Sequence, residues 1–172
     1  LVGLNHWADE LHDVEVLTSG SNPQYRQEGD VTINGDLTIT AGSWTTNTSN
    51  HALTITGLLD VDGGNININD SAVSCAKLIV ESGDTITADN DDDGNALTVT
   101  GAGIGNARSI DFTGAISGTL DIITTHTGTR EDDLSASSGV VNHLTVNHAS
   151  AVMRMNAAAT VGNLTILAGT FS

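Results

Sequence analysis

The chain has 172 residues, a formal net charge of −16 and a sequence pI of about 4.2, which excludes binding of nucleic acid or an anionic membrane through a basic face. Aromatic residues make up only 3% of the sequence and hydrophobic residues 38%, so the core has to be built from Val, Ile, Leu and Ala. The single cysteine, Cys75, excludes an internal disulfide framework, and its apolar neighbours predict a buried, unreactive thiol.

Residues 1–28 differ from the rest of the chain, since they are charged and contain the only Tyr and Pro. In the stretch NHWADELHDVEVL, the side chains of Trp7, Leu11 and Val14 fall on one face at helical spacing. We therefore expect a short helical or extended cap or arm, in which these three residues make assembly contacts.

A repeated phrase begins at residue 29 with GDVTINGDLTITAG. Its most regular part is a tripeptide of Leu, one residue, and Ile or Val, in which apolar and polar positions alternate as in a strand. Steps of 19 to 24 residues separate its leucines, which are Leu37, Leu59, Leu78, Leu97, Leu120, Leu144 and Leu164.

Further short strands are predicted between these tripeptides, with no helical period between them: Val31–Ile33, Leu53–Ile55, Asn65–Asn69, Thr85–Thr87 and Ile110–Phe112. Several short strands for each step of about 20 residues are typical of a parallel β-helix. Residues 29–172 are therefore expected to form an all-β, single-stranded parallel β-solenoid of about seven coils. A β-sandwich or jelly roll, which also has short strands and frequent turns, stays the alternative.

The stretch DNDDDGN carries a candidate metal site, Asp89, Asp91, Asp93 and Asn95. Carboxylates at alternate positions followed by Gly match the first half of a calcium loop. The twelfth position is Thr100, so the bidentate Glu is missing. A weak Ca²⁺ site and a solvated acidic loop both stay open, and no other cofactor is expected.

Other candidates are weaker. Thr-x-Thr pairs recur, as at Thr54/Thr56 and Thr98/Thr100, but an ice-binding face needs a regular array and the steps vary. The six histidines lack metal-binding spacing, and no Ser/His/Asp or Cys/His arrangement is visible. We expect no enzyme activity, with an ice-binding protein and a polysaccharide-degrading tailspike fragment as minor alternatives.

The opening phrase and its echoes, GNALTVTGAG and VGNLTILAG, resemble the glycine-punctuated solenoid repeats of bacteriophage tail fibres and head-decoration or head-fibre proteins. The resemblance is strongest over residues 29–59. It implies a homo-oligomer, with a trimer favoured, on the virion surface and in contact with other virion proteins such as the major capsid protein. Similar phrases occur in bacterial adhesins, so an extracellular adhesin or surface-layer module is the alternative. The last coil lacks an evident cap, so we expect either that a partner covers it in an assembly or that the chain is a piece of a longer protein.

Overall fold

The computed structural model of the chain describes residues 2–4, 11–17, 24–46, 50–89, 96–102, 108–125, 131–155 and 159–171. These ranges contain 18 strands and no helix, and all strand pairs among them are parallel. The fold is a parallel β-solenoid of about six turns. The all-β solenoid prediction is therefore confirmed, with about one coil fewer than expected. A sandwich or jelly roll, built from antiparallel neighbours, is excluded.

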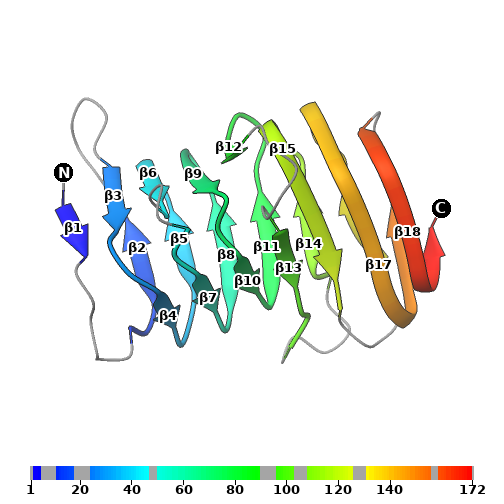
Figure 1. The fold of residues 1–172 in the computed structure, drawn as a ribbon, viewed down its shortest axis with the longest axis horizontal. Coiled ribbons are helices and arrows are strands. Elements are labelled where there is room, and N and C mark those ends of the chain that lie inside the picture. Colours follow the sequence, from blue (N-terminus) through cyan, green and yellow to red (C-terminus); the bar gives the residue numbers. More distant parts are fainter. Residues whose placement is uncertain are drawn as a thin grey trace.

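Each coil contributes strands to three faces, and successive coils follow one another along the long axis (Figure 1). The first face contains β4 (Val31–Ile33), β7 (Leu53–Ile55), β10 (Val73–Cys75), β13 (Ala96–Val99) and parts of β15 (Ala115–Thr124), β17 (Ser138–Arg154) and β18 (Thr160–Phe171). The second face contains β2 (Val14–Val16), β5 (Leu37–Ile39), β8 (Leu58–Val61), β11 (Lys77–Val80), β14 (Ile110–Phe112) and β16 (Glu131–Leu134). The third face contains β1 (Val2–Leu4), β3 (Gln24–Gln27), β6 (Gly42–Thr45), β9 (Gly64–Asn69), β12 (Thr85–Ala88) and the start of β15.

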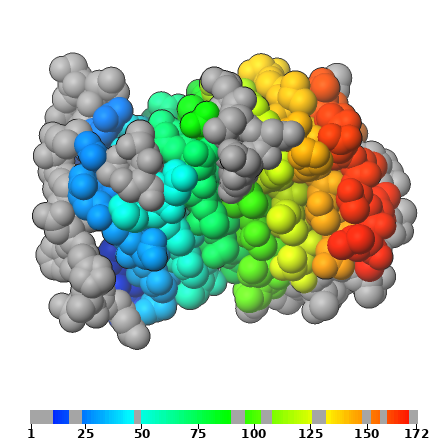
Figure 2. All heavy atoms as spheres, in the orientation of Figure 1, coloured from blue at the N-terminus to red at the C-terminus, as the bar shows by residue number. Residues whose placement is uncertain are grey.

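The core consists of columns of aliphatic side chains that run along the axis. On the first face, one column has an exposed fraction of 1% or less at every member and contains Leu53, Val73, Leu97, Ile122 and Leu144. Inward side chains at equivalent positions of successive coils stack, because parallel in-register pairing places each residue beside its partner in the next coil, about 4.8 Å away. Thin layers of Leu, Ile and Val therefore fill the interior with few aromatic residues, and Figure 2 shows the coils as successive bands of one block.

The seven repeated leucines do not form one column. Leu37, Leu59 and Leu78 are in register on the second face. Leu97 belongs to the column of Leu144 on the first face, through Ile122. The tripeptide encodes an inward–outward–inward strand and occurs on both the first and the second face, so it does not specify the face.

Of the two forms expected for the segment around Trp7, Leu11 and Val14, helical or extended, the described part is extended. Leu11 forms a parallel bridge to Ile33, and Val14 begins β2, in register with Leu37 of β5. The Val-Glu-Val alternation and the backbone groups offered by the next coil favour a strand there. Trp7 lies outside the described residues.

Strand pairing also continues across the expected boundary at residue 28, because β2 and β3 pair with β5 and β6. Leu11 and Val14 are partly buried and pack against the core of the solenoid. The capping or anchoring role of residues 1–28 stays a prediction.

Glycine is required where one coil turns closely over another. Gly139 has φ of 90°, and a Cβ there would lie 2.1 Å from the carbonyl oxygen of Ile116. Both the left-handed backbone and the close approach exclude a side chain at this corner.

Candidate functional site

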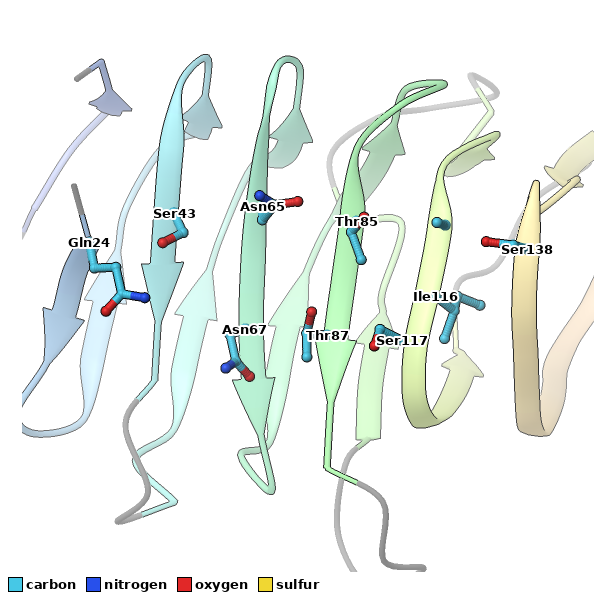
Figure 3. Close-up of a pocket in the computed structure, with 10 residues that line it drawn as sticks. Gln24, Ser43, Asn65, Asn67, Thr85, Thr87, Ile116, Ser117 and Ser138 are labelled. Carbon is cyan, nitrogen blue, oxygen red and sulfur yellow. The ribbon is translucent and has the colours of Figure 1, made fainter. Parts of the chain in front are cut away.

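The third face carries a groove of about 640 Å³. Most of the described residues that line it have uncharged polar side chains, and Figure 3 shows them on neighbouring strands of one face. The longer of its two rows has one residue from each successive coil: Gln24, Ser43, Asn65, Thr85, Ala115 and Ser138. The shorter row contains Asn67, Thr87 and Ser117.

The rows follow from strand alternation and register. Trp44, Ile66 and Ile86 alternate with the groove residues along β6, β9 and β12, and each has an exposed fraction of 0%. Their neighbours consequently point outward, and in-register pairing aligns them across the face. The result is a strip of amide and hydroxyl groups that can both donate and accept hydrogen bonds.

The polar side chains on this face form few hydrogen bonds with one another among the described residues. The Oδ1 atom of Asn67 accepts a bond of 3.1 Å from the backbone N–H of Asn69. The hydroxyl oxygen of Ser43 is buried and has no hydrogen-bond partner among the described residues. Buried polar atoms are usually paired, so this hydroxyl is an exception on the third face.

The second face is acidic. Burial and then the neighbouring Asp62 carboxylate raise the pKa of Asp60, against the opposing effect of Lys77. The Asp62 carboxylate is also the main cause of a raised pKa at the exposed Glu81. Carboxylates of like charge thus repel one another there. Among the described residues, no group of three or more His, Cys, Asp or Glu side chains is arranged to hold a metal ion.

Several acidic side chains bind the backbone of the following coil. The Oδ1 atom of Asp13 accepts a bond of 3.0 Å from the N–H of Asp36, and Asp36 in turn accepts one of 2.7 Å from Leu58. Asp30 accepts one of 2.9 Å from the N–H of Ala52. Part of the negative charge therefore has a structural role, because it satisfies backbone donors at the corners between strands.

Asp132 is a buried carboxylate that accepts hydrogen bonds from the backbone of a neighbouring coil. Its exposed fraction is 0%, and its Oδ1 atom accepts bonds from the Ser109 N–H (2.7 Å), the Ser109 hydroxyl (2.8 Å) and the Ile110 N–H (3.1 Å). Nearby, the Arg108 guanidinium lies 3.4 Å from Asp111 and 3.5 Å from Asp133. The buried carboxylate connects two neighbouring coils through three donors.

The predicted metal loop is only partly described. Asp89 is exposed and follows the end of β12, whereas Asp91, Asp93 and Asn95 lie outside the described residues. The calcium site therefore stays a prediction.

The Thr-x-Thr pairs are divided among three faces, and only Thr54 and Thr98 share a row, with Ser74 between them. Thr38 lies on the second face in β5, Thr54 and Thr98 lie on the first in β7 and β13, and Thr85 lies on the third in β12. The motif therefore marks outward strand positions on every face.

His143 is a polar corner residue. Its Nδ1 atom lies 3.0 Å from Asp121 Oδ1, and its Nε2 atom lies 3.1 Å from Asn163 Nδ2. These contacts join His143 to the preceding and the following coil.

The prediction for Cys75 is confirmed. The residue has an exposed fraction of 1% and is a free cysteine within the aliphatic core. Burial raises the pKa of its thiol to about 12, so the reactive thiolate is not populated at neutral pH.

Comparison of the chain with protein-family models, with curated proteins and with solved structures found no significant match. Within the ranges that the structure describes, no helix is long and apolar enough to cross a membrane. The protein therefore belongs to the structural class of parallel β-solenoids.

Proposed function

We propose that this chain is a non-enzymatic structural protein of a virus particle, a subunit that decorates a phage capsid or forms part of a fibre. The support is the fold together with the resemblance of its repeats to phage solenoids. Stacked coils make a stiff rod whose faces can carry polar side chains while the aliphatic columns hold it together. Such a rod suits a spacer or a surface-covering subunit.

The observation that carries the proposal is the apolar edge at β18, at the far end of the rod in Figure 1. Leu164 and Ile166 are 43% and 45% exposed, although they continue the columns of Leu144 and Val146, each 0% exposed. Leu167 adds a further 66% exposed side chain. An exposed, apolar edge strand favours pairing with another strand. We infer that a further strand covers this edge, from a neighbouring subunit, from another virion protein or from a further coil of a longer chain.

Assembly can be tested on the isolated chain by native mass spectrometry. We expect an oligomer, with a trimer favoured, and we expect the double variant Leu164→Asp/Ile166→Asp to be monomeric, because two buried carboxylates would disfavour the interface. Thr54→Asp is the control, since Thr54 is exposed on the first face in β7, away from both ends of the rod. A wild-type chain that is monomeric at all concentrations would contradict the assembly proposal.

Location separates the virion role from the alternative, an extracellular bacterial adhesin or surface-layer module. Proteomics of purified virus particles and of cell envelopes from the same source should find the chain among the virion proteins. Its recovery only in the envelope fraction would favour the adhesin.

A further inference from the structure

We propose that the groove on the third face binds a linear, uncharged polysaccharide, which lies along the solenoid axis and crosses β3, β6, β9, β12 and β15. This binding activity goes beyond the structural role proposed above and does not depend on it.

The chemistry of the lining fits a polyhydroxylated ligand. Every hydroxyl of a sugar can donate one hydrogen bond and accept others, and Ser, Thr, Asn and Gln side chains offer both functions. Asn65, Asn67, Thr85 and Thr87 supply two amides and two hydroxyls from adjacent strands (Figure 3).

The shape of the groove fits an extended ligand. Its longer row runs without a break in register from Gln24 to Ser138, and five strand spacings correspond to about 24 Å. Ala115 and Ser138 are small, so the sheet surface is accessible at that end. A polysaccharide with a short repeat can make a similar contact with each coil. The binding free energies of several weak contacts then combine, because one polysaccharide chain makes all of them.

Charge selects against acidic polymers. The residues that line the groove carry no charged side chain, whereas the chain as a whole has a net charge of −16. At one edge, the Nε atom of Arg26 is 2.9 Å from the Glu28 carboxylate, and this ion pair offsets the positive charge. A polyanion would be repelled by the surrounding surface without a compensating cation in the groove.

The same row does not favour an ice lattice or a protein strand. Gln24, Ser43 and Asn65 are consecutive in the row and differ in length, so the surface is uneven. An ordered water layer requires repeated groups of equal height. A bound protein would be expected to bury apolar side chains at the centre of its interface, and the groove offers few.

The test is affinity electrophoresis of the full chain in native gels that contain hydroxyethyl cellulose, dextran, linear mannan or xylan, with alginate as the acidic counterpart. We expect at least one neutral polymer to retard the protein and alginate to have no effect. The double variant Asn65→Val/Thr85→Val keeps strand-forming residues but removes two polar groups, and it should weaken binding roughly tenfold or more.

The matched control is Thr54→Val/Thr98→Val, which changes two outward positions on the first face and should leave retardation unchanged. Circular dichroism establishes that both variants are folded. The proposal is overturned if no neutral polymer retards the protein, if alginate binds equally well, or if the control variant loses binding to the same extent. Thermal hysteresis that Asn65→Val/Thr85→Val abolishes would assign the face to ice instead.

Discussion

Replacement of Asp132 by Ala should be among the most damaging single changes in the chain. The variant removes the acceptor of three buried bonds, from two backbone N–H groups and one hydroxyl. The Ser109 hydroxyl can rotate towards another acceptor, but the N–H groups of Ser109 and Ile110 are fixed by the strand. Because a buried unsatisfied donor costs about 1–3 kcal/mol, we expect Asp132→Ala to lower the free energy of unfolding by roughly 3–5 kcal/mol.

The assay is urea unfolding followed by far-UV circular dichroism, with the midpoint and slope compared between variants. Asp132→Asn keeps an oxygen at the Oδ1 position and should recover more than half of the loss. Asp111→Ala is the control at a partly exposed position: it removes the ion pair that Asp111 forms with Arg108 and should cost no more than about 1 kcal/mol. If Asp132→Ala and Asp111→Ala unfold at the same urea concentration, the buried carboxylate does not hold the two coils together.

Three further outcomes are expected. Asp60→Asn should stabilise the protein at pH 7, because the folded chain holds this carboxyl with a raised pKa. The advantage should decrease as the pH falls through the raised pKa and disappear below the ordinary value of 3.8, where both the folded and the unfolded wild type are protonated. Urea titrations at several pH values check this. Gly139→Ala should cost at least about 2 kcal/mol from backbone strain and the clash with Ile116, whereas Gly83→Ala, with φ of 105° and no atom within 4 Å of the new Cβ, should cost about 1 kcal/mol; equal urea midpoints would refute the steric argument. Cys75 should react with a thiol reagent only on unfolding, and rapid labelling of the native chain would contradict its burial.

Local alternation was sufficient to predict individual strands. Val31–Ile33 and Ile110–Phe112 have the same bounds in the structure as β4 and β14, because an inward–outward–inward tripeptide is a property of the local sequence. The same period of two in Val14–Val16 describes β2 correctly. The helical spacing of Trp7, Leu11 and Val14 was misleading, since three apolar residues can match that period by coincidence.

Features that depend on register could not be predicted from the sequence. The alternation in Asn65–Asn69 indicates outward amides, but the groove also requires Ser43 and Thr85 beside Asn65, which depends on the lengths of the connecting corners. Asp132 belongs to an acidic run that suggests solvent exposure. Its burial depends on Ser109, which is 23 residues away in the sequence.

The arrangement of the strands also determines how the molecule would respond to a mechanical load. β1 and β18 lie at opposite ends of the long axis (Figure 1), so tension between them acts along the hydrogen bonds that join neighbouring coils. Such bonds break one after another under load. Each released coil of about 20 residues would add about 70 Å of extended chain, and the force trace would show a series of small, regular peaks.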